Sequence, residues 1–266
     1  MRILNWGTAK NIIIGVYIVL NIFLLTIFYT NNTRDNISKS TINDTIVALK
    51  KRGVLVNCEL PMYNKETGTL SYDKFEFDRK KIVEDMFEQK YYDDNNIYRL
   101  DDKDINFVNK NKIIYTENNY YVHNNGKNDI MSSVDKLLEK IGIKFNDKIV
   151  EKCGKDIVIY ERYKKFYIFE NYIKINNEND KLIIEINYKK INNINNRKRE
   201  IMPIYQVLIK NMISIKGEEI EGISFGFKES TMEDNIKELD DIPVWRLKLG
   251  ENNYIFYRAY TGQELK

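Results

Sequence analysis

The chain has 266 residues, with 42 Lys and Arg against 39 Asp and Glu, one His, two Cys and three Pro. A net charge of +3 is too small to predict a nucleic-acid-binding protein, because such domains carry a larger and more clustered basic excess. One histidine excludes His-pair metal centres and Cys₂His₂ fingers, and two cysteines exclude a Cys₄ zinc site. The composition therefore disfavours an enzyme, and we expect no cofactor.

The first apolar segment of the chain is residues 12–29, which read IIIGVYIVLNIFLLTIFY without a charged residue. As a helix this segment would be about 27 Å long, close to the hydrocarbon thickness of a bilayer. A cleaved signal peptide is the alternative, but no small-x-small cleavage site follows, because the next residues are Thr30 to Thr33. We expect residues 12–29 to be an uncleaved transmembrane helix.

Charge alone decides the orientation of this helix only marginally. Arg2 and Lys10 precede it, and Arg34 and Lys39 follow it. A short basic tail is hard to translocate, whereas a long folded domain crosses the membrane whatever its charge. We therefore expect a single-pass protein of the cell membrane, with residues 1–11 in the cytoplasm and the domain after residue 30 outside the cytoplasm.

The next element is a juxtamembrane helical segment over residues 30–53. Ile42, Ile46 and Leu49 have the spacing of one helical face, and Gly53 stands where a left-handed helix terminator is favoured. The apolar run that follows, from Val54, predicts a strand that ends before the next proline.

The rest of the chain alternates strand-like runs with amphipathic helical segments. Helices are predicted after the N-cap Asp78, over 131–141 and over 201–215. The predicted strands include 156–161, 165–169, 172–175, 182–188, 219–227, 243–249 and 253–260. This order predicts an α+β fold of antiparallel sheets packed with helices, in two lobes, residues 54–125 and 126–266.

Several residues resemble catalytic or metal-binding patterns without completing one. Ser133 and Lys136 have the SxxK spacing of penicillin-recognising enzymes, but no KTG triad occurs, so we expect a helix-capping serine and a solvated lysine. His123 follows a predicted strand and is expected at the surface. The acidic pairs and the basic run are expected to be solvated turns and loops; they are Asp93-Asp94, Asp101-Asp102, Asp240-Asp241 and Arg197-Lys198-Arg199.

Asn21 is the polar residue of most interest, because it lies near the middle of the apolar span. An amide in hydrocarbon prefers a hydrogen-bond partner on a neighbouring helix, worth about 0.6–2 kcal/mol. The alternative is an asparagine tolerated within an Ile-rich helix. The sequence does not decide between these two interpretations of Asn21.

Two ordered sets of motifs lie at the two ends of the chain. The first is Asn5-Trp6, Lys10 and Asn21 within VLNI. The second set has four motifs near the C-terminus. They are Ile223–Phe227, which contains Phe225 and Gly226; Pro243-Val244-Trp245; Phe256–Ala259; and Thr261-Gly262. Together with Gly53–Pro61, these sets resemble the YycI proteins of the YycH/YycI family from low-GC Gram-positive bacteria. Phe225 replaces a usual Leu and Tyr260 is inserted before Thr-Gly, and both changes are conservative for a strand.

This resemblance implies a non-enzymatic membrane regulator. It implies that the chain associates with a YycH-like protein and a WalK-type sensor histidine kinase, and so tunes a two-component system that controls cell-wall metabolism. We expect the helix face with Asn21 to make this contact, with Trp6 and Lys10 setting its depth. The alternative is an anchored extracytoplasmic binding module for a cell-wall polymer or peptide.

Overall fold

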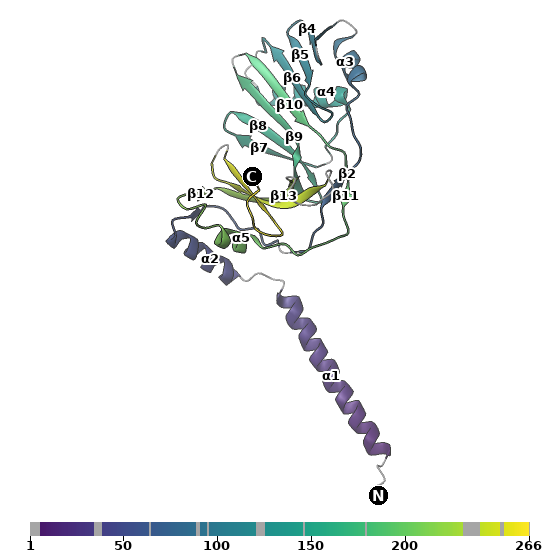
Figure 1. Ribbon diagram of the computed structural model, residues 1–266, viewed down its shortest axis with the longest axis vertical. Coiled ribbons are helices and arrows are strands. Elements are labelled where there is room, and N and C mark those ends of the chain that lie inside the picture. The colour runs from purple at the N-terminus through teal and green to yellow at the C-terminus, as the bar shows by residue number, and fades with distance from the viewer. Residues whose placement is uncertain are drawn as a thin grey trace.

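The computed structural model describes ten segments of the chain, which are residues 6–34, 39–63, 65–88, 91–94, 96–120, 126–145, 147–178, 180–230, 240–250 and 253–265. They form five helices and a sheet-rich body (Figure 1). The predicted α+β class is confirmed.

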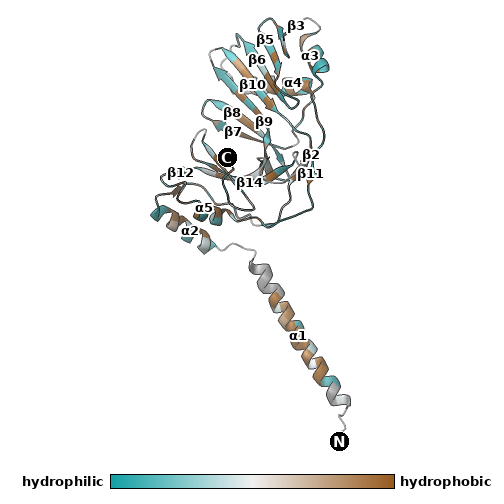
Figure 2. Cartoon of the chain, viewed as in Figure 1, coloured by the Kyte–Doolittle hydropathy of each residue, from teal (hydrophilic) through white to brown (hydrophobic). Residues whose placement is uncertain are grey.

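Helix α1 (Trp6–Arg34) stands apart from the sheet-rich body (Figure 1). Its 18-residue segment from Lys10 to Ile27 has a mean hydropathy of 2.0 and buries no residue against the rest of the chain. Figure 2 shows this apolar stretch in the middle of the helix. By length and composition, α1 can cross a bilayer.

Helix α2 (Lys39–Lys51) follows the apolar helix after four intervening residues. Its last residue is Lys51, and the predicted terminator Gly53 follows two residues later with a φ of +83°, the left-handed conformation that glycine adopts without strain. Strand β1 (Leu55–Val56) then pairs in parallel with β12 (Glu219–Ile220). The strand predicted from Val54 onward is therefore only two residues long.

Most strands belong to one large, bent sheet. Its order is β11-β2-β14-β13-β9-β10-β6-β5-β4-β3, with β15 beside β14, and with β8 beside β9 and β7 beside β8. The strands before β9 are β2 (Leu70–Tyr72), β3 (Tyr92–Asp94), β4 (Ile97–Leu100), β5 (Lys103–Phe107), β6 (Lys112–Asn118), β7 (Lys148–Cys153) and β8 (Asp156–Tyr163). From β9 onward they are β9 (Phe166–Glu178), β10 (Lys181–Asn187), β11 (Ile191–Ile194), β13 (Gly222–Glu229), β14 (Asp241–Lys248) and β15 (Tyr254–Arg258).

Strand β9 connects the two parts of this sheet. Its first residues pair in parallel with β13, its later residues pair antiparallel with β10, and β8 pairs antiparallel with both parts. The two strands predicted at 165–169 and 172–175 are therefore one strand of 13 residues. The register shift in its pairing with β8, between Tyr160 and Glu161, accommodates the bend.

Two large hydrophobic cores lie on this sheet. The first, called here the α4 core, places α3 (Arg79–Phe87) and α4 (Gly126–Ile141) against strands such as β5, β6, β9 and β10. The second, called here the α5 core, places α2 and α5 (Ile204–Lys210) against β13, β14 and β15. Because the α4 core combines residues from 75 to 188, it includes side chains from both sides of residue 125. The division into lobes at that point stays a prediction.

The helix predictions differ in outcome. Asp78 caps α3 as predicted, since its carboxylate accepts a hydrogen bond from Lys81 N at 3.1 Å. Helix α4 reaches its predicted end at Ile141, before Gly142 with φ +78°. The helix predicted over 201–215 was too long: α5 has seven residues, and turns follow it up to Gly217.

Candidate functional site

The residues predicted to form an interaction face lie on one side of α1. Trp6, Lys10 and Asn21 all belong to this helix. At 3.6 residues per turn their positions fall within an arc of about 60°, and Tyr17 falls within the same arc. Lys10 and Asn21 are exposed, while the side chain of Trp6 lies outside the described residues. We call Trp6, Lys10, Tyr17 and Asn21 the polar stripe of α1.

The amide of Asn21 retains hydrogen-bonding capacity on this stripe. Its Nδ2 donates to Tyr17 O at 2.8 Å, one turn earlier. This bond uses one of two amide hydrogens and leaves the carbonyl Oδ1 as an acceptor. The N–H groups within a helix are already bonded to its own carbonyls, so a donor for Oδ1 must come from outside the helix. In hydrocarbon, that donor would be another helix.

The opposite side of α1 offers a different kind of surface. A shallow groove forms beside Gly15, because an added Cβ there would meet nothing within 4 Å. Within the described part of the chain, the groove is lined by Ile12, Gly15, Val16, Val19, Leu20 and Phe23. Small residues let helix backbones approach closely, but this face offers no hydrogen bond. The two faces can therefore be distinguished by substitution.

Three of the C-terminal motif residues are core residues. Phe225, Trp245 and Ala259 are buried in the α5 core. The Trp245 ring meets Phe225 edge to face at a centroid distance of 4.9 Å. The Trp245 indole Nε1 donates to Met202 O at 2.9 Å, which ties β14 to the segment before α5.

The other three motif residues control close backbone approaches. A Cβ on Gly226 would lie 2.7 Å from Tyr167 Cβ, so only glycine lets β13 pair here with β9. Gly262 has φ +67° and leaves room for the sulfur of Met202. Pro243 O accepts a bond from Ala259 N at 2.9 Å. The motif set therefore builds the sheet rather than an exposed site.

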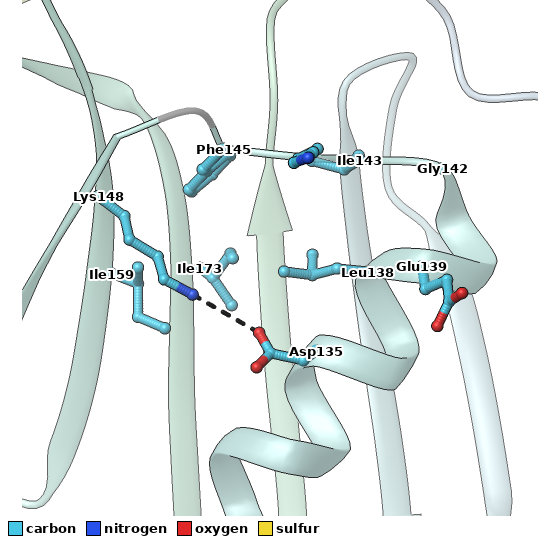
Figure 3. Close-up of a pocket in the computed structure, with 10 residues that line it drawn as sticks. Asp135, Leu138, Glu139, Gly142, Ile143, Phe145, Lys148, Ile159 and Ile173 are labelled. Atoms are coloured by element: carbon cyan, nitrogen blue, oxygen red, sulfur yellow. Dashed lines mark ion pairs between the residues drawn. The ribbon is translucent and has the colours of Figure 1, made fainter.

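A cavity of about 460 Å³ lies between α4 and the sheet (Figure 3). Its apolar lining consists of Leu138, Ile143, Phe145, Ile159 and Ile173, and its charged lining of Asp135, Glu139, Lys144 and Lys148. Figure 3 shows the ion pair at its rim, where Lys148 Nζ lies 3.6 Å from Asp135 Oδ1. An apolar floor with a few charged groups is typical of a small-ligand or peptide site.

The sequence did not indicate the buried guanidinium of Arg246. Both faces of β14 are covered, and Arg246 is 4% exposed. Its Nε donates to Ser224 Oγ at 2.9 Å and its Nη2 to Glu151 Oε1 at 2.5 Å. Nη1 has no hydrogen-bond partner among the described residues.

Aromatic rings and one carboxylate keep this guanidinium charged. Its carbon lies 4.8–5.2 Å from the ring centroids of Tyr160, Tyr167, Phe169 and Tyr254. Burial is the largest single influence and lowers the pKa of Arg246, but the hydrogen bond and charge of Glu151 together with Tyr160 and Tyr167 outweigh it, so the pKa is raised. Cation–π contacts and the ion pair together offset the desolvation of the charge. We assign this cluster a structural role.

The prediction that Asp241 is a solvated turn residue was wrong. Asp241 begins β14, pairs with Leu70 of β2 and is 1% exposed. Tyr72 Oη donates to its Oδ2 at 2.6 Å, and Lys189 Nζ lies 3.5 Å from its Oδ1. Burial raises the pKa of this carboxyl to about 6, although Lys189 and Tyr72 partly oppose the shift.

The remaining candidates are not assembled into a catalytic or metal centre among the described residues. Lys136 is exposed on α4, and the Ser133 side chain and His123 lie outside the described residues. Where the chain is described, no three His, Cys, Asp or Glu side chains gather to hold a metal ion. Asp101 is exposed, and so is the basic run at 197–199.

These features define a class: a chain with one apolar helix of membrane-spanning length followed by an α+β domain with two cores. A family model described as YycI protein matches residues 32–259. The chain therefore belongs to the YycI family. The match covers the domain and begins after the residues of the polar stripe on α1. A comparison with curated proteins found no match.

Proposed function

We propose that this chain is a membrane-anchored regulator of a WalK-type sensor histidine kinase, acting together with a YycH-like protein and thereby on cell-wall metabolism. In this proposal α1 spans the cell membrane, its N-terminal end is cytoplasmic and the α+β domain is extracytoplasmic. Membership of the YycI family over residues 32–259 is the observation that carries the proposal. The regulation requires no catalytic step by this chain.

The polar stripe on α1 supports a contact within the membrane. A regulator changes its target only by binding one state of that target more tightly than another. Asn21 offers an unused amide hydrogen and a carbonyl to a neighbouring helix, and Lys10 lies on the same face near the end of the apolar segment. This face can therefore bind a partner helix of the kinase or of the YycH-like protein, and the domain adds contacts outside.

Replacing Asn21 by leucine should weaken this association by about 3- to 30-fold, the equivalent of 0.6–2 kcal/mol. The measurement is Förster transfer between labelled full-length chain and a WalK-type kinase, with and without the YycH-like protein, in proteoliposomes. Thr26→Leu is the matched control, because Thr26 bonds to its own helix at Ile22 O and lies on the opposite side of α1. Equal association of the Asn21→Leu variant and the wild-type chain would remove the stripe from the mechanism.

The cavity beside α4 favours a second candidate, an anchored binding module for a cell-wall peptide or polymer. Its apolar floor suits aliphatic groups, and both signs of charge at its rim suit a peptide with carboxylate and ammonium groups. This function would not require a kinase.

A soluble muropeptide added to the full-length chain in nanodiscs should then protect amides 138–148 from hydrogen exchange. Lys144→Glu should weaken the effect about fivefold, because it reverses one rim charge. Lys140→Glu is the control: this residue is exposed in the last turn of α4 and does not line the cavity. Exchange that is unchanged at saturating muropeptide would exclude this candidate.

A further inference from the structure

The outer surface of the α5 core has an exposed apolar tip surrounded by basic residues. Ile213, in the turns after α5, is 84% exposed. It lines a shallow depression together with Lys51, Arg52, Gly53, Met212 and Lys216. We call Lys51, Arg52, Met212, Ile213 and Lys216 the basic apolar patch. Among the described residues, no acidic side chain lines this depression.

The patch is held together by backbone contacts between its two segments. Gly217 N donates to Gly53 O at 2.9 Å, so the turn after α5 is attached to the end of α2. The inward faces of both helices are buried through residues such as Leu49 and Val207. Val47 and Ile209 point away from that core and are 52% and 42% exposed. The helix layer thus presents apolar side chains on the surface opposite its core.

The position of the patch in the chain limits its distance from the end of α1. Residues 35–38 separate α1 from α2, so the gap from Arg34 to Lys39 spans at most about 18 Å. Helix α2 adds about 20 Å to its far end, where Lys51 lies. Figure 1 shows α2 and α5 at the end of the domain nearest α1. If α1 spans a bilayer, the patch is within reach of its headgroups.

We propose that the basic apolar patch binds the anionic headgroup surface of the bilayer that α1 spans, and so holds the domain in one orientation on the membrane. Lysine and arginine near such a surface each contribute about a fivefold factor in affinity, and an exposed isoleucine can insert below the headgroups. Among the exposed apolar surfaces described, this one combines three cations without a lining acid and a short connection to the span. The binding goes beyond the proposed regulation of a kinase.

The test places a polarity-sensitive fluorophore on Ile213→Cys in the full-length chain, in a Cys58→Ser background because Cys58 is only half-buried. Nanodiscs contain either phosphatidylglycerol with phosphatidylcholine or phosphatidylcholine alone. We expect a blue shift in the anionic discs only, reversed by salt. The matched control is the same label on Tyr92→Cys, which is 82% exposed on β3 and should show no shift.

Reversing the three charges together, by Lys51→Glu, Arg52→Glu and Lys216→Glu, should abolish the blue shift. If this triple variant does not fold, the salt titration of the labelled chain with its basic residues intact tests the same electrostatic contact. Absence of a blue shift in anionic discs would overturn the proposal. So would a shift of equal size in neutral discs. A shift that appears only in discs with two copies of the chain would assign the patch to self-association, and it would also overturn the proposal.

Discussion

Replacing Trp245 by alanine should lower the free energy of unfolding of the domain by about 3–5 kcal/mol. Trp245 is fully buried in the α5 core, where it contacts Phe225. The substitution leaves a large cavity and removes the donor that Met202 O uses. Denaturant unfolding of the full-length chain in detergent, followed by circular dichroism of the sheet, measures the loss.

Two further variants separate packing from hydrogen bonding in this result. Trp245→Phe retains an aromatic ring but has no Nε1–H, so its loss should fall between those of the wild type and the alanine variant. Tyr92→Ala removes a ring that is 82% exposed and should change stability by less than about 0.5 kcal/mol. A loss below about 1 kcal/mol for Trp245→Ala would contradict a core that depends on this residue.

The second large effect is a pH dependence of stability caused by Asp241. Folding raises the pKa of this carboxyl from 3.8 to about 6, so the folded chain binds the proton more tightly than the unfolded chain. The protonated Asp241 therefore stabilises the fold. This stabilisation is fully present below pH 3.8, the pKa of the carboxyl in the unfolded chain, and is lost as the pH rises through about 6. The difference is about 3 kcal/mol between pH 3.5 and pH 7.5, because each unit of pKa is worth about 1.4 kcal/mol.

Asp241→Asn should remove this pH dependence. Between pH 3.5 and pH 7.5 the free energy of unfolding of the variant, relative to that of the wild type, should therefore rise by about 3 kcal/mol. The comparison with wild type at each pH cancels other groups, such as Asp156 and Glu185, whose pKa values are lowered and which act in the opposite direction. Urea unfolding at several pH values between 3.5 and 7.5 gives the difference. Parallel pH profiles of wild type and variant would refute the burial of a titrating Asp241.

The neighbouring carboxylate provides the matched control for this experiment. Asp240→Asn removes a partly exposed acid one residue earlier, which accepts a bond from Thr69 Oγ1 at 3.1 Å. Comparing the two variants separates the loss of Asp241 from the loss of one carboxylate at this end of β14. The groups that face Asp241 are Tyr72, Lys189, Glu170 and Glu229, and all four remain in both variants.

Local signals in the sequence were enough to predict the elements whose ends are marked by single residues. Gly53 and Gly142 end α2 and α4 in the left-handed conformation, and Asp78 caps α3. Capping depends on contacts within one turn of helix, so it can be read without the rest of the fold. The apolar segment of α1 was predicted for the same reason, because length and composition are local properties.

Features that depend on distant segments could not be predicted in this way. The sequence around Glu170 suggested a break, but β9 continues because β8, β10 and β13 supply hydrogen-bonding partners along its length. The burial of Arg246 could not be predicted from β14 alone, because Tyr160 and Tyr254, which cover its guanidinium, belong to other strands. Asp241 was misplaced for the same reason: Tyr72 and Lys189, which bury it, are far away in the chain.

The candidate functional sites show the same difference between local features and features formed by distant segments. Asn21 could be recognised from sequence because a single amide in an apolar segment is conspicuous, and Lys10 and Tyr17 follow from helical periodicity. The cavity beside α4 could not be recognised, since it is formed where Phe145, Ile159 and Ile173 converge from separate elements. The basic apolar patch likewise combines the end of α2 with the turns after α5.

The continuity of β9 restricts how the length of this chain can change. Ile173 and Ile175 belong to the α4 core, whereas Phe166 packs against the α5 core. Side chains alternate between the faces of a strand, so one inserted or deleted residue near position 170 would exchange the faces of one half relative to the other. Loops elsewhere can gain or lose residues, but the middle of β9 is a segment of fixed length. The number of residues in this segment determines which side chains of β9 face the α4 core and which face the α5 core.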